Sequence, residues 1–565
     1  MPIESRWKTD LPEVSLPTWV FGSPTGPLPS FKAFMDANHP NDNYVTFEGY
    51  RLLSKRLALG FQKAGLVQGD RALLYAGNSI YFPSIFMGIV MSGGIFAGAS
   101  PMFGPRELSY QIKDSGSRFL VTHKPGLKTA LEAAATVGLA PSQVYVVDDT
   151  LQPGDSTKLD GARHWSELIA PTAEAEQFQW FEPRNPRETT CCLNYSSGTT
   201  GLPKGVEISH FSYVANGQAH SLNETGNPAN KAASGPQTSL CFLPMYHAAG
   251  QTTYIANNPK LGYQTAIMPY YNLEDVLRHI QTFKINTLSI APAVVLQLAK
   301  SPLTSKYDLS SLREIVSGTA PLSPEVAAEL EKKIWPNGEN FIRQGWGMTE
   351  ITCAGLIWAF DDKHKSSSVG EIIANARFRI RDGDKEITEP NKTGELWFSG
   401  PTLMKGYWRN PKADRETIVI EKDGSRWLRT GDVVYVDKYE TGAKVYLVDR
   451  MKELIKVRGF QVSPSELEGI LLDRKDIADA GVVGVQVNGE EVPRAFVVRT
   501  SNVTAKEIIA FVDSRVAKYK RLRGGVVFVD TIPRTSSGKI LRRELRNLNP
   551  PASDPASKPL KARLA

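Results

Sequence analysis

The sequence predicts an α/β fold, with a large N-terminal domain of parallel-rich sheets flanked by helices and a small α+β domain after it. Three observations support this prediction. The chain has 565 residues, more than one ordinary domain needs. Between residues 273 and 344, short apolar runs alternate with helical patterns, as in parallel strands joined by helices. Beyond Asp449 the predicted elements become shorter and the composition changes.

The composition is that of a folded protein with a mild positive charge. Hydrophobic residues make up 41% of the chain and charged residues 22%, so it can bury large cores. The 66 basic and 59 acidic residues give a net charge of +7, which by itself does not favour a nucleic-acid partner. The four cysteines form no CxxC pair and suit reduced core thiols of an intracellular protein; they are Cys191, Cys192, Cys241 and Cys353.

The first part of the chain is expected to wrap the surface and then to alternate strands with helices. Residues 1–43 are rich in proline and turn formers and hold no long apolar run, so we expect no secretory signal. Thr46 is expected to cap a helix that ends near Gly65, and Arg71–Tyr75 to form a strand. The uncharged stretch from there to Arg106 could span a membrane, but its scattered glycines favour a buried strand–helix–strand.

The middle of the chain is predicted to continue this alternation, interrupted by one exposed loop. Residues 220–239 are polar and rich in Asn, Ser, Pro and Gly, and are expected to form that loop. The predicted strands are Val144–Val147, Thr189–Tyr195, Asn286–Ala291, Arg313–Val316 and Phe341–Gln344, and the predicted helices are Leu273–Phe283 and Pro324–Trp335. In parallel sheets, function is expected at the loops that follow the strands.

The chain after Asp449 is predicted to be the small domain. Ser463–Glu466 and Thr504–Glu507 have the pattern of helix capping boxes. The predicted strands are Gly481–Val487, Ala495–Val498 and Val526–Val529. We therefore place the large domain at residues 1–448, a joint at residues 449–452 and the small domain at residues 453–565.

A loop rich in glycine and hydroxyl groups follows the strand predicted at Thr189–Tyr195. In Ser196–Gly205 the glycines let backbone N–H groups approach an anion, the hydroxyls add donors and Lys204 adds positive charge. The spacing is not that of a Walker A loop, and neither serine has the preceding glycine of a hydrolase nucleophile elbow. The segment is either a phosphate-binding loop or a flexible polar surface loop.

The sequence of this loop resembles a known signature. Tyr195–His210, YSSGTTGLPKGVEISH, is similar to the phosphate loop of the acyl-adenylate-forming enzymes. That family includes acyl-CoA synthetases, 4-coumarate–CoA ligases, beetle luciferases and peptide-synthetase adenylation domains. The resemblance covers about residues 40 to 548 and implies that the small C-terminal domain is mobile. In the loop it implies ATP binding by Ser196, Ser197, Gly198, Thr199, Thr200, Gly201 and Lys204.

A second motif, Gln344–Glu350 (QGWGMTE), places an aromatic ring between two glycines. Such a ring offers a stacking face for adenine, and the alternative is a core tryptophan at a strand end. The family usually has tyrosine here, so Trp346 is a departure that keeps the stacking surface. Thr349 is expected to contact phosphate and Glu350 to bind Mg²⁺. The ATP-binding residues that the resemblance implies near adenine are Gln344, Gly345, Trp346, Gly347, Gly318, Thr319 and Ala320.

Two further segments are similar to nucleotide and acid contacts of the family. The carboxylate of Asp432, in a Thr-Gly-Asp segment, suits the two ribose hydroxyls, with Arg450 as its companion. His247 is either a core histidine or, by resemblance, a gate between the nucleotide and the acid. 4-Coumarate ligases carry a tyrosine two residues after this histidine, where this chain has Ala249, so a phenolic substrate is disfavoured.

In the small domain the resemblance covers a hinge, a thiol entrance and two catalytic lysines. It implies that Lys452 is the hinge, that Lys539 acts in adenylation and that Lys456 acts in thiol transfer. It implies coenzyme A binding by Arg458, Gly459, Phe460 and Gln461. The basic run from residue 515 to 546 is expected to be a solvated face or to meet coenzyme A phosphates, and its few aromatics disfavour nucleic acid.

Together the motifs predict an ATP-dependent carboxylic acid–CoA ligase that uses Mg²⁺, coenzyme A and an aryl or medium-chain acid. Its expected catalytic residues are Lys539, Lys456, Thr349, Glu350 and His247. The alternatives are a luciferase-like oxidoreductase and a catalytically inactive nucleotide-binding homologue; a peptide-synthetase module would need a carrier domain after Lys539. We expect a cytosolic monomer or weak homodimer without a membrane span. Ala562–Leu564 resembles a peroxisomal address but is followed by Ala565, so the peroxisome is the alternative location.

Overall fold

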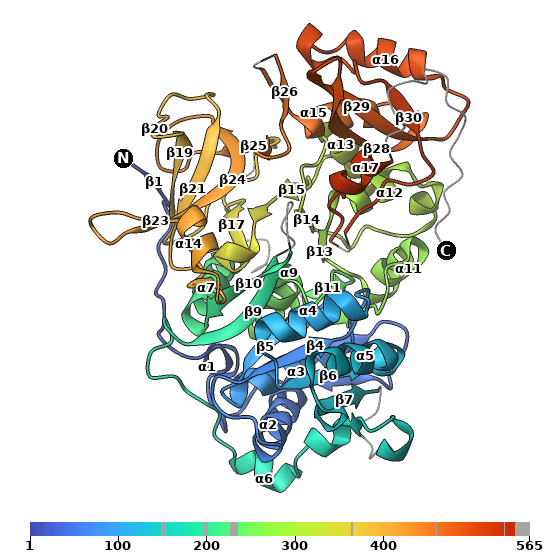
Figure 1. Ribbon diagram of the computed structural model, residues 1–565. Coiled ribbons are helices and arrows are strands. Elements are labelled where there is room, and N and C mark those ends of the chain that lie inside the picture. The colour runs from blue at the N-terminus through green and yellow to red at the C-terminus, as the bar shows by residue number, and fades with distance from the viewer. Residues whose placement is uncertain are drawn as a thin grey trace.

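The computed structural model describes residues 1–148, 151, 154–196, 202–226, 236–362, 365–458, 460–535 and 537–548. Two sheets flanked by helices make up most of the molecule (Figure 1). An antiparallel sheet stands beside them, and the C-terminal elements lie over one end, above α12 (Pro292–Lys300) and α13 (Pro324–Ile334). This arrangement confirms the predicted α/β class with parallel-rich sheets and a small C-terminal part.

The first sheet carries the phosphate-loop segment near one edge. Its strands run in the order β22, β10, β9, β5, β4, β6, β7, β8, parallel from β9 to β8 and antiparallel at β10 and β22. Their bounds are β22 Gly406–Tyr407, β10 Lys204–Ser209, β9 Thr190–Ser196, β5 Ile95–Ala99, β4 Arg71–Tyr75, β6 Phe119–His123, β7 Val144–Val147 and β8 Arg163–His164.

The second sheet carries the adenine-side motifs at its edge. Its order is β15, β14, β13, β11, β12, β2, β3, and all neighbours are parallel except β2 and β3. The bounds are β15 Arg343–Gln344, β14 Glu314–Ser317, β13 Thr287–Ile290, β11 Thr238–Cys241, β12 Gln264–Ile267, β2 Lys32–Asp36 and β3 Tyr44–Thr46. The loops after β14 and β15 hold the predicted site residues, as expected for the carboxyl ends of parallel strands.

Helices cover and separate these two sheets. α3 is buried along its whole length and packs on α2, where Gly88 lies so close to Leu57 that a Cβ would be 2.7 Å away. Thr46 caps α2 through its side chain, as predicted. The bounds are α1 Leu16–Phe21, α2 Phe47–Lys63, α3 Phe82–Met91, α4 Pro105–Ser115, α5 Leu127–Val137, α6 Thr172–Gln177, α7 His210–Gly226, α9 Ala248–Gly250, π-helix η5 Gln251–Asn257, α10 Asn258–Lys260 and α11 Leu273–Phe283. In the described part of the chain, no helix is long and apolar enough to cross a membrane.

Two antiparallel sheets follow in the chain, and the smaller one contains Trp346 and Gly347. The larger one runs β1, β19, β21, β24, β23, with β20 beside β19 and β25 beside β24. Its bounds are β1 Ile3–Glu4, β19 Arg377–Asp382, β20 Lys385–Glu386, β21 Gly394–Ser399, β23 Ile418–Ile420, β24 Arg426–Val436 and β25 Val445–Arg450. The smaller one comprises β16 Trp346–Gly347, β17 Ala354–Ile357 and β18 Glu371–Ile372, and the short helices nearby are η7 Thr349–Ile351 and α14 Pro411–Thr417.

The C-terminal part has its own hydrophobic core around a hairpin and a three-stranded sheet. Its elements are β26 Ile455–Val457, β27 Phe460–Val462, α15 Pro464–Leu472, β28 Ile477–Val487, β29 Glu490–Arg499, α16 Ala505–Asp513, β30 Val526–Phe528 and α17 Arg542–Asn547. Thr504 and Glu507 form the predicted capping box. Ser463 caps α15, but Glu466 pairs with Lys520 instead of completing the box.

Two local predictions were wrong. Residues 1–43 do not merely wrap the surface, because α1 is buried and β2 pairs with β12 inside the second sheet. Residues 220–239 are not one exposed loop, because α7 continues to Gly226 with Glu224 buried and β11 begins at Thr238. In both segments, contacts with distant parts of the chain outweigh the turn-forming composition. Residues 227–235 of the second segment lie outside the described ranges.

Candidate active site

A cavity of about 770 Å³ lies between the large part of the molecule and the C-terminal part. It brings together loops that follow β14 and β15, the strands β24 and β25, and the segment before α17. The predicted site residues that line it are Thr319, Ala320, Gln344, Gly345, Trp346, Gly347, Asp432, Arg450, Lys452 and Lys539. Motifs that are far apart in the sequence therefore surround one space large enough for a nucleotide and an acid.

Asp432 is held by two side chains at the wall of this cavity. The indole Nε1 of Trp346 donates a 2.8 Å hydrogen bond to Asp432 Oδ2, and the Nε of Arg450 lies 3.4 Å from Oδ1. Asp432 and Arg450 are direct neighbours in the pairing of β24 with β25. Burial raises the pKa of the Asp432 carboxyl, and the Arg450 charge and the indole hydrogen bond act against that rise.

Trp346 is a core residue that also lines the cavity, and its stacking on adenine stays a prediction. Its side chain belongs to the hydrophobic core and is 6% exposed, as expected of a core tryptophan at a strand end. It also lines the cavity and uses its polar edge to orient Asp432. This indole–carboxylate bond was not predicted, because nothing in the local pattern links residues so far apart.

Glu350 and Lys204 meet through Tyr407, a residue that sequence reasoning missed. The Tyr407 hydroxyl donates to Glu350 Oε1 at 2.9 Å, and the Nζ of Lys204 lies 4.3 Å from the centroid of the tyrosine ring. Burial and then the Glu350 charge raise the pKa of Tyr407. No local sequence pattern indicates this role, because β22, which carries Tyr407, reaches β10 only through long-range pairing, and the N–H of Trp408 donates to the carbonyl of Gly205. The predicted phosphate-loop lysine and metal-binding carboxylate are thus brought together.

The predicted phosphate loop lies between two paired strands. Ser196 at the end of β9 pairs with Lys204 at the start of β10, and the two strands are antiparallel. Ser197, Gly198, Thr199, Thr200 and Gly201 lie outside the described residues. Helix α4 supports both sides of this strand pair, because Tyr110 donates to the carbonyl of Pro203 and Asp114 accepts from Tyr195, at 2.9 and 2.7 Å.

Lys539 lies in an enclosed environment with charges of both signs. Burial, followed by the charge of Arg450, lowers the pKa of the Lys539 ammonium from 10.5 to about 8, and Asp432 and Glu350 partly oppose this. The pKa of His247 falls to about 4, first through burial and then through the charge of Lys539. The predicted gate histidine therefore stands near the predicted adenylation lysine and is neutral at neutral pH.

The predicted thiol-side residues lie elsewhere. Lys456 and Gln461 face each other across the exposed hairpin of β26 and β27, and Arg458 pairs with Glu490 at 2.8 Å. Phe460 is 55% exposed and stacks on Tyr519, with ring centroids 4.5 Å apart. Among the described residues of this loop, none lines the cavity, and Gly459 lies outside the described ranges. The structure therefore does not bring the two predicted lysine sites together.

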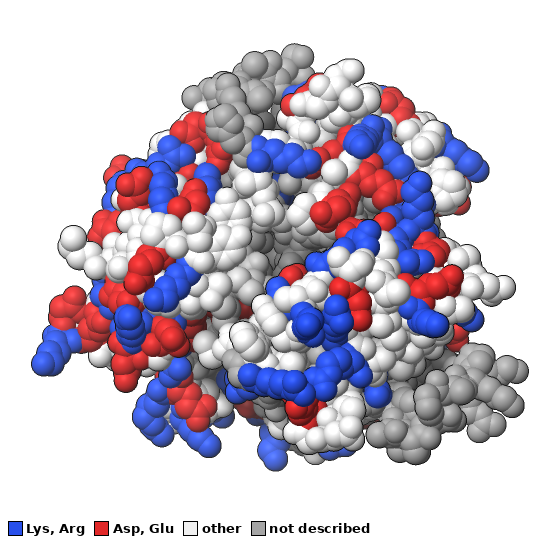
Figure 2. Space-filling view, turned by 90° about the horizontal axis from the view of Figure 1, so that it is seen from above, with Lys and Arg blue, Asp and Glu red and all other residues white. Residues whose placement is uncertain are grey.

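Five of the ten basic residues in the run from residue 515 to 546 form ion pairs with acidic side chains, so the run is not uniformly basic at the surface. Figure 2 shows Lys and Arg intermixed with Asp and Glu on the face seen from above. The ion pairs are Lys520–Glu466, Arg521–Asp513, Arg523–Glu490, Arg534–Asp479, Arg542–Glu453 and Arg542–Glu468. The sequence could not reveal this, because the acidic partners lie outside the run.

The predicted hinge adjoins a buried carboxylate. Asp449 is 4% exposed and accepts hydrogen bonds from Ser463 Oγ at 2.7 Å and from the N–H of Ser465 at 3.1 Å. Lys452, three residues later, is exposed. Asp449 thus ties the end of β25 to the start of α15, which leaves Lys452 in a short exposed link.

Glu350 fits a magnesium ligand. Within the described ranges, no group of three or more His, Cys, Asp or Glu residues could hold a metal. Mg²⁺ needs no such cage, since it keeps several waters and binds substrate phosphates with one or two carboxylates. Glu350 is 8% exposed and connects through Tyr407 to Lys204, on the side where the phosphates are expected.

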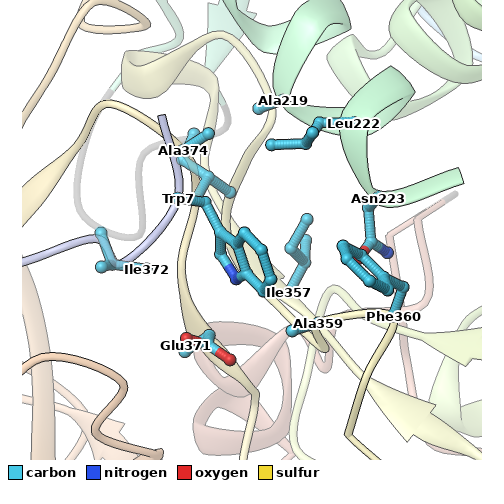
Figure 3. Close-up of a pocket in the computed structure, with 11 residues that line it drawn as sticks. Trp7, Ala219, Leu222, Asn223, Ile357, Ala359, Phe360, Glu371, Ile372 and Ala374 are labelled. Carbon is cyan, nitrogen blue, oxygen red and sulfur yellow. The ribbon is translucent and has the colours of Figure 1, made fainter. Parts of the chain in front are cut away.

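A smaller cavity lies apart from this site (Figure 3). Its volume is about 20 Å³, room for about one water molecule. The indole of Trp7 lies beside the ring of Phe360, 4.9 Å between centroids, with Leu222 and Glu371 nearby. This cavity shares no lining residue with the larger one and is too small for an acid, so it is a packing gap where the N-terminal segment docks.

Comparison with known families agrees with this geometry. The AMP-binding enzyme family matches residues 29–408, and the AMP-binding enzyme C-terminal domain matches residues 466–539. The chain therefore belongs to the AMP-binding enzyme family, among its AMP-forming acid–CoA ligases. The recognised family and the enzyme class predicted from the motifs are confirmed.

The relatives of this chain are named for several different acids. The chain is 37% identical to 4-coumarate–CoA ligase of Pinus taeda over 512 residues, 90% of each chain. It is 33% identical to phenylacetyl-CoA ligase epaB of Aspergillus niger over 555 residues, 97% of this chain and 99% of the relative. The structure of anthranilate CoA ligase AuaEII in complex with anthranoyl-AMP has a TM-score of 0.80 at 23% identity, covering 95% of this chain and 98% of that one. At that identity the likeness concerns the fold alone.

Proposed function

We propose that this protein uses ATP to join an aryl or medium-chain carboxylic acid to coenzyme A in two steps. The observation that carries the proposal is the single cavity that gathers Asp432, Arg450, Trp346 and Lys539 from distant parts of the chain. The chain belongs to a family of AMP-forming acid–CoA ligases, and the cavity brings together the residues proposed to contact the adenine, the ribose and the α-phosphate.

In the first step the acid carboxylate attacks the α-phosphorus of ATP. A new carboxylate–phosphorus bond forms, the bond to the bridging oxygen breaks, and pyrophosphate leaves with the electron pair. The products are acyl-AMP and pyrophosphate. The Lys539 ammonium would stabilise the negative charge that develops between carboxylate and phosphate, and its partly desolvated surroundings make that charge count for more.

Other residues, at the cavity wall and beside the predicted phosphate loop, would bind and orient the nucleotide. Asp432, held by Trp346 and Arg450, would accept hydrogen bonds from the ribose hydroxyls. Lys204 and Thr349, with the phosphate loop, would contact the phosphates. Mg²⁺ would be held by Glu350, and when bound it would neutralise phosphate charge.

In the second step the thiol of coenzyme A attacks the acyl carbonyl. The new carbon–sulfur bond replaces the carbon–oxygen bond to AMP, the thiol proton goes to solvent or a base, and AMP leaves. For this step we propose that the small domain rotates about Lys452 and presents Lys456, Arg458, Phe460 and Gln461 to the acyl-AMP. The exposure of the Lys456 hairpin in the present orientation supports this proposal.

The acid is proposed to be aryl or medium-chain, and an acid without a phenol is favoured. Two relatives are named for acids that contain a benzene ring: phenylacetate has no phenol and 4-coumarate has one, so the choice against a phenol rests on this chain's own residues. The residue after Ala249 is Gly250, and packing requires a glycine there, since a Cβ would lie 2.2 Å from the carbonyl oxygen of Pro244. Ala249 is half-buried and offers no hydroxyl to a phenol.

The test is acid-dependent pyrophosphate release across a panel of arylacetic, benzoic, cinnamic and medium-chain acids with ATP, Mg²⁺ and coenzyme A. We expect release with at least one aryl or medium-chain acid and a matching acyl-CoA by mass spectrometry. Release with light emission or oxygen uptake would indicate a luciferase-like oxidoreductase. No ATP consumption with any acid would indicate an inactive homologue and overturn the proposal.

A further inference from the structure

Thr319 has an unusual backbone conformation that coincides with a contact to the C-terminal part. Its φ is +77°, in the left-handed region that β-branched residues rarely adopt. Its hydroxyl donates a 3.0 Å hydrogen bond to the carbonyl oxygen of Ser537. Ser537 stands two residues before Lys539 in the chain. A strained residue after β14 therefore holds the loop that carries the proposed adenylation lysine.

Thr352 provides a comparison within the large part of the molecule. Its φ is +72°, and its hydroxyl donates a 2.8 Å hydrogen bond to the carbonyl of Thr402. Both threonines thus have a left-handed backbone and a hydroxyl bound to a carbonyl. The bond of Thr352 is buried and joins two loops of the large part, whereas that of Thr319 depends on where the C-terminal part stands.

Ala291 forms a second contact with the same loop. It follows β13 and is 4% exposed. Gly538 has a φ of +87°, and a Cβ built on it would lie 2.9 Å from the Cβ of Ala291. A larger side chain at either position would therefore push the loop away from the large part of the molecule.

The shape of the loop is set by the C-terminal part itself. The N–H of Thr535 donates to the carbonyl of Lys539, the N–H of Gly538 donates to that of Thr535, both at 2.8 Å, and Arg534 donates to the carbonyl of Gly538 at 3.0 Å. Across the described ranges, the Thr319 bond is the one hydrogen bond between residues 460–548 and the chain before β25. Thr319 and Ala291 therefore bear on where this loop is placed against the large part and not on how it is folded, while Leu472 of α15 packs on the core beneath α12 and α13.

We propose that Thr319 and Ala291 form a seat for Ser537 and Gly538 that positions Lys539 for adenylation. This inference rests on the proposed function, in which the small domain rotates before the thiol attacks. Rotation would carry Ser537 away from Thr319, so the seat acts in the first step alone. Both are positioning residues, because they act on Lys539 through the loop.

Single-turnover rates of each half-reaction test the seat. We expect Thr319→Val, which keeps the β-branch and loses the hydroxyl, to slow acyl-AMP formation about threefold. Ala291→Val is expected to slow it about tenfold by crowding Gly538. Thiolysis of supplied acyl-AMP should stay at the wild-type rate, and Thr319→Ser should restore the rate of acyl-AMP formation. Equal losses in both half-reactions, or no rescue by serine, would overturn the proposal.

A measurement of domain orientation separates the seat from the proposed function. Spin labels on ketone-bearing unnatural residues at the exposed positions 306 and 506 report the distance between the two parts by pulsed electron resonance. We expect Thr319→Val and Ala291→Val to shift population away from the wild-type distance, and Thr319→Ser to keep it. Distributions that superimpose on the wild type would overturn the seat. If the wild type activates no acid, the proposed function fails while this measurement still decides the seat.

Two variants control for ordinary loss of stability. Thr304 is 2% exposed and donates its hydroxyl to the carbonyl of Leu298 at 2.6 Å, so Thr304→Val removes a similar bond away from the loop. Ala327 is 7% exposed in α13, so Ala327→Val crowds a buried alanine in the neighbouring core. Both are expected to lower the melting temperature and to leave the label distance unchanged. A shift of the distance in either control would contradict a specific seat.

Discussion

Two lysine-bearing loops of the C-terminal part stand in opposite environments. Lys539 lines the cavity beside Asp432 and Arg450. Lys456 is exposed on the hairpin of β26 and β27. Both lysines belong to the C-terminal part, and in the orientation of this structure only Lys539 of the two lines the cavity.

The comparison shows that the surroundings of a lysine set how strongly its ammonium interacts with nearby charges. An ammonium in water is screened, whereas one that is partly desolvated interacts strongly with nearby charge. Burial against the large part lowers the pKa of Lys539 to about 8, while Asp432 and Glu350 keep the cation favourable. In the proposed mechanism each lysine gains this environment only when its loop lies against the large part, so substitutions in one loop should affect one half-reaction.

The largest expected effect comes from removing the lysines themselves. Lys539→Ala should slow acyl-AMP formation about a hundredfold or more, because a positioned donor at developing charge is worth about 3–4 kcal/mol. Lys456→Ala should slow thiolysis of supplied acyl-AMP and spare its formation. Single-turnover assays of each half-reaction measure both, with Lys506→Ala, an exposed lysine of α16, as the control. If both variants depress both steps equally, one closed state does all the chemistry.

The next effect is a pH limb that only the buried lysine should produce. Lys539 is charged below its pKa of about 8 and neutral above it. The adenylation rate should therefore be level below pH 8 and fall about tenfold per pH unit well above it. Lys539→Arg should remove this limb, since guanidinium stays charged. Single-turnover profiles from pH 6.5 to 9.5 decide the matter, and a wild-type rate that is still level at pH 9.5 would contradict the assignment.

A smaller effect is expected at the cavity wall where Trp346 holds Asp432. Trp346→Phe keeps an aromatic ring but removes the donor to Asp432, so the KM for ATP should rise about tenfold with less change in kcat. Trp165→Phe is the matched control, because its indole also donates to a carboxylate, that of Asp148, away from the cavity. An unchanged KM in Trp346→Phe would show that this bond does not serve ribose binding.

The smallest effect is expected on the exposed loop. Phe460→Leu removes the stack on Tyr519 and should raise the KM for coenzyme A about threefold while adenylation is unaffected. Tyr270→Leu, an exposed aromatic of the large part, serves as the control. Steady-state kinetics with coenzyme A varied give the answer; a loss in adenylation instead would place Phe460 in the first step.

Most helices and strands, and the enzyme class, could be predicted from the sequence alone. The helix after Thr46, the buried strand–helix–strand from Arg71 and the strand at Thr190–Ser196 follow from local patterns of apolar and capping residues. Such patterns act over a few residues, so one chain is enough to recognise them. The motifs also named residues that the structure gathers around one cavity, including Asp432 and Lys539.

Which of these residues contact one another became clear from the tertiary structure alone. The N-terminal segment became part of two sheets through β1 and β2, and Tyr407 came to join Lys204 with Glu350. The indole of Trp346 turned to Asp432, and Thr319 reached Ser537. These pairs join residues that are far apart in the chain, and their contacts depend on how sheets and domains pack, which no local pattern encodes.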